Sequence, residues 1–182
     1  MTSIVIITII ALALVWGIII YNKLVHDRNT SLAAWSDIDV QLKRRHDLIP
    51  KLIEAVKQYA SYESSLLESV TTLRSQAKSI EEISERQNVE RELQTQVHKL
   101  IALAEDYPEL KANQNFLELQ AQLEGTENRI SVERGRFNES VQIFNTSVRQ
   151  FPANIIAGFF GFEQKVYFKA DVGAEKVPEV KF

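Results

Sequence analysis

The residues of this sequence with the most chemical potential are its three histidines and its acidic side chains. His26, His46 and His98 lie on different segments, without the spacing of metal ligands. Glu81 and Glu82 are adjacent carboxylates, but they belong to a polar stretch that we expect to be exposed. The chain has no cysteine, which excludes disulfides, thiolate metal sites and cysteine nucleophiles.

The sequence also lacks the motifs of the common enzyme classes. It has no nucleophile elbow, phosphate-binding loop, dinucleotide fingerprint or zinc-protease signature. No Glu-x-x-His pair occurs, so a diiron site in a helical bundle is excluded as well. The net charge of −3 gives no electrostatic case for nucleic-acid binding. We therefore expect a protein that is not an enzyme, uses no cofactor or metal, and binds no nucleic acid.

Three charged residues stand on apolar stripes, where a charge is costly unless it is paired. They are Arg45, Glu127 and Arg134. In two antiparallel helices, residues whose numbers add to about 172 lie level, which places Arg45 opposite Glu127. These three residues are candidates for a buried polar layer that fixes helix register or transmits a signal. In the alternative, the Arg45 and Glu127 side chains reach out to the edge of the bundle.

Helices must position these residues, because apolar side chains recur at steps of three and four along most of the chain. Glycine and proline are scarce and cluster late. The pattern predicts an all-α fold, in which an N-terminal transmembrane helix leads into an antiparallel up-down bundle of about four helices. The apolar stripes cover residues 35–59, 66–80, 89–104 and 116–148.

The connections between these helices follow from turn and capping signals. A turn near Ser61 separates the first two stripes. Residues 78–88 form an exposed polar connection that can hold a helical turn, and the capping-box spacing Ser79–Glu82 inside it indicates a new helical start or a local turn. Pro108 ends the third stripe, and Phe151-Pro152 ends the fourth. Pro50 removes one backbone donor and should kink the first helix near residues 45–46 without reversing the chain.

The N-terminal segment has the features of a membrane anchor. Residues 4–20 carry no charge, and Tyr21 and Asn22 extend the helix to a length that spans the hydrocarbon layer. No basic residue precedes the segment and no small-residue cleavage site follows it, which favours an anchor over a cleaved signal peptide. Lys23, Arg28 and the basic run 43–45 then predict a short outer N-terminus and a cytoplasmic C-terminal domain.

A second apolar segment, residues 151–162, follows the last helix. It is too short to span a bilayer but suits an interfacial helix, and the level arithmetic places it near the membrane surface. In the alternative, it folds over the open end of the bundle. The candidate membrane-contact residues are Trp16, Tyr21, Ile155, Ile156, Phe159, Phe160 and Phe162.

The chain therefore divides into an anchor (1–22), a helical bundle (23–150), an apolar membrane-proximal segment (151–162) and a C-terminal tail (163–182). Val177, Glu179, Val180 and Phe182 alternate as in an extended, strand-like tail. Such a tail is disordered, docks on its own bundle, or recognises a partner.

Several stretches in this order resemble the LemA family, from the anchor to the C-terminus. The densest are YNKLV at 21–25, AWSDIDVQLKRRHDLIP at 34–50 and LAEDYPELKAN at 103–113. Further matches are TENRI at 126–130, the Phe-Asn pair at 137–138, the Asn-Thr pair at 145–146, FP at 151–152, FGF at 160–162 and PEVKF at 178–182. His46 stands where a tyrosine is more usual, a mild departure from the pattern.

The resemblance implies a bacterial, single-pass protein of the inner membrane with a cytoplasmic helical domain, no established catalytic activity and no known ligand. Some relatives are associated with membrane organisation and others with membrane proteases. We therefore expect a membrane-anchored scaffold or adaptor whose partners are the lipid bilayer and a second copy or another membrane protein. The alternative is a membrane-shaping or envelope stress factor that inserts its Phe-rich segment into one leaflet.

Overall fold

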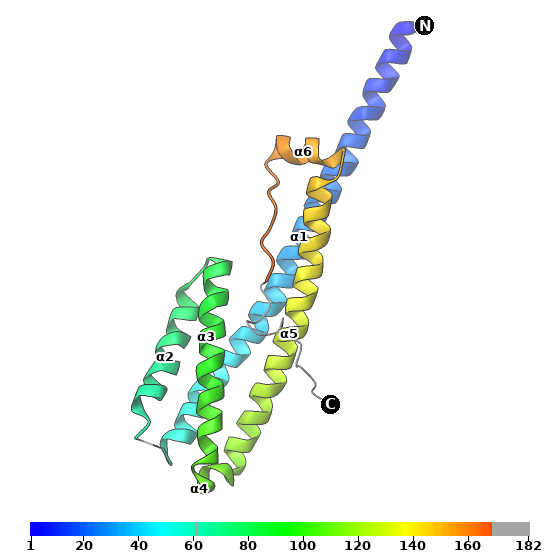
Figure 1. Cartoon of the computed structure of the whole chain (residues 1–182). Coiled ribbons are helices and arrows are strands. Elements are labelled where there is room, and N and C mark those ends of the chain that lie inside the picture. Colours follow the sequence, from blue (N-terminus) through cyan, green and yellow to red (C-terminus); the bar gives the residue numbers. More distant parts are fainter. Residues whose placement is uncertain (61, 169–182) are drawn as a thin grey trace, which may run out of the picture. The chain divides into compact units, whose positions relative to one another are not determined.

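The computed structural model describes residues 1–60 and 62–168 (Figure 1). Within these ranges every regular element is a helix, which confirms the all-α prediction. The strand-like pattern predicted at Val177–Phe182 lies outside the described residues. The elements are α1 (Thr2–Lys57), α2 (Ser64–Ser79), α3 (Ile83–Ala102), the short 3-10 helix η1 (Leu103–Glu105), α4 (Pro108–Lys111), α5 (Gln114–Arg149) and α6 (Ala153–Phe160).

Helix α1 is a single element of 56 residues. Of the helices in the described ranges, it is the one long and apolar enough to cross a membrane, and none of its most apolar window is buried. The helix continues through Pro50, so the chain does not reverse there. A bend near residues 45–46 stays a prediction.

Two predicted connections hold more helix than the sequence indicates. The helical start that the capping-box spacing allows within 78–88 is present, because α3 begins at Ile83 with Glu82 as its cap, so half of this stretch is helix and not connection. The Glu82 carboxylate accepts hydrogen bonds from the backbone N–H groups of Ser84 at 2.9 Å and Glu85 at 2.6 Å, so the capping role expected of Ser79 belongs to Glu82. Pro108 follows the end of the third helix as expected, but it also starts α4, where its missing N–H has no cost.

The chain forms two compact units, and unit 1 comprises Met1–Ile38 and Val132–Tyr167. It contains the first part of α1, the second part of α5, and α6. The rings of Trp35 and Phe137 meet edge to face with centroids 5.7 Å apart, which confirms the predicted level of these two residues. The core of unit 1 consists of Leu24, Ile38, Phe137, Val141, Phe144 and Ala157.

Within the described chain, unit 2 comprises Asp39–Ser131 and Phe168. It contains the end of α1, the α2–α3 hairpin, η1, α4 and the start of α5, with α2 and α3 lying antiparallel (Figure 1). Each fully buried leucine, isoleucine or valine here contributes about 1.5–3 kcal/mol. The core includes Ile49, Leu52, Val56, Val70, Leu93, Leu100, Leu110 and Phe116, all at most 1% exposed.

Candidate functional site

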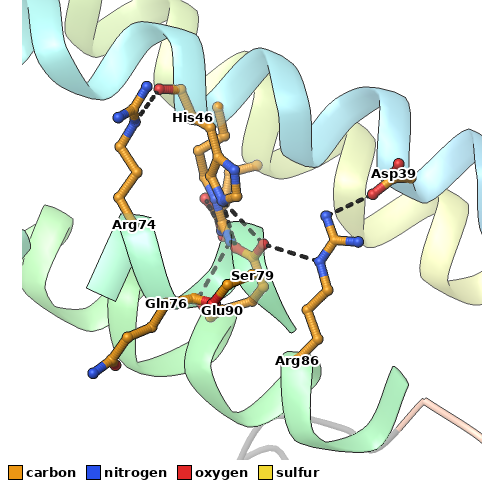
Figure 2. A network of polar contacts seen from close by, with 9 residues as sticks. Asp39, His46, Arg74, Gln76, Ser79, Arg86 and Glu90 are labelled. Atoms are coloured by element: carbon orange, nitrogen blue, oxygen red, sulfur yellow. Dashed lines mark hydrogen bonds and ion pairs between the residues drawn. The ribbon is translucent and has the colours of Figure 1, made fainter. Parts of the chain in front are cut away.

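Buried charges meet around Glu90 of α3 in unit 2 (Figure 2). The side chains of Arg45 and Glu90 are each 1% exposed and form a direct ion pair. The same Arg45 nitrogen donates to the Glu90 backbone carbonyl at 3.3 Å. Glu127 lies 3.5 Å from the other terminal nitrogen of Arg45 and is 25% exposed. The predicted contact between Arg45 and Glu127 is therefore present, but the buried partner of Arg45 is Glu90.

Two more basic side chains face the Glu90 carboxylate. The Nε2 atom of His46 lies 3.0 Å from Oε1 and 3.2 Å from Oε2 of Glu90. Since a carboxylate can only accept, this nitrogen carries the proton. Arg86 places Nε 3.8 Å from Oε1 of Glu90 and binds Asp39 of α1 through Nη2 at 2.6 Å. The Glu90 carboxylate thus joins α3 to α1 through Arg45 and His46, and Arg86 of α3 adds a separate bridge to Asp39 of α1 (Figure 2).

Opposing effects set the charge state of Glu90. Burial raises the pKa of its carboxyl, but the hydrogen bonds and positive charges of His46 and Arg45 together outweigh burial, and the pKa lies below its ordinary value. Glu90 is therefore ionised at neutral pH. The Arg45, His46 and Glu90 side chains are almost fully buried, at 1–3% exposure. The cluster fastens α3 to α1.

A further contact replaces the hydrogen bond that helix α1 loses at Pro50. In an α-helix the N–H of residue 50 would bond to the carbonyl of residue 46, but proline has no N–H. Arg74 of α2 donates its Nε–H to the His46 carbonyl at 2.7 Å (Figure 2). The carbonyl that Pro50 leaves without its helical partner is thus satisfied by the neighbouring hairpin, and α2 is fastened to α1 at the same turn.

Sequence reasoning missed Glu90 and Arg74. Glu90 lies three residues before Leu93, in phase with the apolar stripe of α3, and that position was the available signal. The polar composition of residues 78–88 hides this signal, because it favours an exposed connection directly before Glu90. Arg134, the third residue of the predicted polar layer, is partly buried on the part of α5 that belongs to unit 1, and its place in such a layer stays a prediction.

A second candidate site is the end of unit 1 formed by α6, which lies against the last apolar turn of α1 (Figure 1). The Tyr21 ring lies 4.7 Å from the ring of Phe160 and 5.8 Å from that of Phe162, measured between centroids. A Cβ at Gly17 would lie 3.9 Å from Cδ1 of Ile156, an ordinary van der Waals distance. These contacts fix α6 at the level of residues 17–21.

The predicted membrane-contact residues divide into two groups. Tyr21, Ile156 and Phe162 are partly buried within unit 1. The others are exposed: Trp16 by 51%, Ile155 by 62%, Phe159 by 83% and Phe160 by 54%. Helix α6 thus covers the end of the unit with one side and turns apolar side chains outward with the other. Contact of these side chains with lipid stays a prediction.

Polar contacts hold the rest of this end together. Ser147 of α5 donates to the buried carboxylate of Asp27 at 2.7 Å. The Asn145 amide donates to the Lys165 carbonyl at 2.9 Å and accepts from the Lys165 N–H at 2.8 Å. The Lys165 ammonium binds Ser31 at 2.7 Å. Burial, and then the charge of Arg28, lower the pKa of Lys165. The chain after α6 is therefore tied to both long helices of unit 1.

A sequence model of the LemA family matches residues 34–182. The chain belongs to the LemA family. It is 26% identical over 140 residues to Protein LemA of Metamycoplasma hominis, covering 75% of this chain and 63% of the relative. It is 21% identical over 174 residues to the magnetosome protein MamQ of Magnetospirillum gryphiswaldense, covering 81% of this chain and 64% of the relative. It is 20% identical over 175 residues to the magnetosome protein MamQ 2 of Paramagnetospirillum magneticum, covering 82% of this chain and 64% of the relative. The chain thus spans 63–64% of the length of these relatives.

Proposed function

We propose that this LemA-family chain is a non-enzymatic scaffold of the inner membrane that associates with itself or with other membrane proteins. The observation that carries the proposal is the attachment of α6, with its outward aromatic side chains, to the last apolar turn of α1. A helix that only capped a soluble bundle would bury Phe159 and Phe160. Their exposure beside an exposed apolar helix is explained if both lie in one bilayer.

The lengths of the elements agree with this placement. The uncharged stretch 4–20 rises about 25 Å, slightly less than the hydrocarbon layer of about 30 Å. Tyr21 must then lie at the boundary of that layer, and α6 lies beside it. An apolar helix at this depth lies flat in the interface. The basic residues Lys23 and Arg28, which follow directly, favour the cytoplasmic side for the bundle.

The membrane placement of α6 can be tested on the full chain, because the absence of cysteine allows single labelling sites. Phe159→Cys in lipid nanodiscs carries a polarity-sensitive dye, and Leu117→Cys, at an exposed leucine of α5, is the matched control. We expect lipid-borne quenchers to act on the dye at position 159 and aqueous iodide to act on the dye at position 117. Equal iodide quenching at both positions would contradict the placement.

The scaffold role is tested by the state of the protein in membranes. We expect native mass measurement from nanodiscs to give oligomers, or proximity labelling in cells to recover a reproducible set of membrane proteins. A protein that is only monomeric and has no specific neighbours would refute the proposal. The similarity to proteins named for magnetosomes supports a role at a membrane.

The exposed face of α6 also favours a second candidate function, in which the protein shapes membranes as part of an envelope stress response. Aromatic side chains inserted into one leaflet would expand it and favour curvature. Electron microscopy of liposomes that carry the full chain, compared with the Phe159→Ser/Phe160→Ser variant, tests this alternative. Identical liposome shapes with both proteins would exclude it.

A further inference from the structure

A polar groove of about 420 Å³ lies beside the end of α5 in unit 1. We propose that it binds the phosphate of an anionic lipid headgroup from the bilayer that α6 contacts. The inference rests on the proposed membrane placement and adds a specific lipid ligand to it. The groove is lined by Asn145, Thr146, Arg149, Gln150, Gln164 and Tyr167.

The walls of the groove are fixed before any ligand arrives. One wall is the final part of α5, and the other is the segment after α6. Asn145 is 5% exposed and holds the second wall through its two hydrogen bonds to the Lys165 backbone. Gln164 and Tyr167 flank that anchored residue, so they face α5 across the groove at set positions. Such preorganisation lowers the cost of ordering a ligand.

The groove offers hydrogen-bond donors that suit a phosphate. Within residues 1–60 and 62–168, the Arg149 guanidinium forms no ion pair. It is joined by the amides of Gln150 and Gln164 and the hydroxyls of Thr146 and Tyr167. The planar fork of arginine matches two phosphate oxygens at once, and the neutral donors can bind the remaining oxygens.

The depth of Arg149 in unit 1 is that of lipid phosphates. The 2.7 Å contact between Ser147 and Asp27 sets the register of the antiparallel helices and places Arg149 level with Val25. Val25 lies four residues beyond Tyr21, or about 6 Å along α1. The headgroup layer on each side of a bilayer is about 5–7 Å thick. If Tyr21 marks the hydrocarbon boundary, Arg149 lies among the headgroups.

The charges at this end of unit 1 also favour an anion. Lys23, Arg28 and Lys165 accompany Arg149, whereas the acidic residues at this end of the part of unit 1 that the structure describes are Glu163 and Asp27. Asp27 is buried and already accepts from Ser147, so it does not neutralise the groove. Burial, and then the positive charge of Arg28, lower the pKa of Lys165. A basic surface at headgroup depth attracts anionic lipid by about 1 kcal/mol per cation.

The test uses the full chain in nanodiscs of mixed phosphatidylcholine and phosphatidylglycerol, with native mass spectrometry to count the lipids that stay bound. We expect phosphatidylglycerol to be retained in preference to phosphatidylcholine. Arg149→Gln should lower that preference about fivefold, which corresponds to one surface cation. Arg129→Gln removes the same charge twenty residues earlier on α5, where the side chain is exposed, and should leave the preference unchanged. Arg149→Lys should give an intermediate value, because it keeps the charge and loses the fork.

The proposal is overturned if Arg149→Gln retains the full preference, or if Arg129→Gln lowers it equally. It is also overturned if inorganic phosphate displaces the retained lipid as readily as phosphatidylglycerol does, since the groove would then bind free phosphate. The dye at position 159 separates this proposal from the membrane placement. A dye in lipid without any preference for phosphatidylglycerol refutes the groove alone, whereas a dye in water refutes both.

Discussion

Replacing Glu90 by glutamine removes the one fully buried negative charge of the cluster in unit 2 while keeping the size of the side chain. Arg45 remains buried, and its remaining anionic partner in the cluster is Glu127 at 3.5 Å. The glutamine amide has one acceptor oxygen in place of two, which Arg45 and the Nε2–H of His46 must share. The variant therefore leaves a buried guanidinium with incomplete compensation and loosens α3 from α1.

The expected loss of stability follows from burial. Removing one partner of a buried ion pair costs about 3–5 kcal/mol, because the remaining charge keeps its desolvation penalty. Glu127→Gln is the matched control, since it removes the same charge from the same arginine at a longer distance and with a more exposed side chain. An exposed pair contributes about 0–1 kcal/mol, so the two variants should differ by several-fold in their effect on stability.

Urea unfolding of the full chain in detergent, followed by circular dichroism, measures these differences. The double variant Arg45→Met/Glu90→Leu is the second control, because apolar residues of similar volume can replace a buried ion pair without loss. We expect it to be more stable than Glu90→Gln alone. The reasoning is wrong if Glu90→Gln costs less than about 1 kcal/mol, or if Glu127→Gln destabilises as much.

Two more predictions concern the same helices. The pKa of Glu90 is lower in the folded protein than its ordinary value of 4.5. The contribution of its ionised carboxylate to the stability of the fold is therefore complete above pH 4.5 and declines as the pH falls through the folded pKa. Urea midpoints should fall with acid in the native protein and fall less in Glu90→Gln. Arg74→Met should cost about 1–3 kcal/mol by leaving the His46 carbonyl unpaired. The cost should be smaller in a Pro50→Ala background, because alanine restores the backbone N–H that bonds to the His46 carbonyl. An equal cost in both backgrounds would contradict the compensating role of Arg74.

The long helices, and the contacts between their apolar stripes, could be predicted from the sequence alone. The uninterrupted patterns before residue 60 and after residue 116 set the register that brings Trp35 to Phe137 and Arg45 to Glu127. It was not sufficient for Glu90, because a charge at the polar start of a helix looks the same whether it faces water or a buried arginine. For Arg74, Pro50 showed that one carbonyl needed a donor but not which helix would supply it.

The hydrogen bond from Arg74 to the His46 carbonyl also has an evolutionary consequence. Pro50 and Arg74 lie on different helices and do not need to touch, yet each makes the other useful. A lineage that replaces the proline no longer needs a long donor at position 74, and one that loses the arginine first carries a defect until position 50 changes. We therefore expect these two positions to vary together among relatives, although they are twenty-four residues apart.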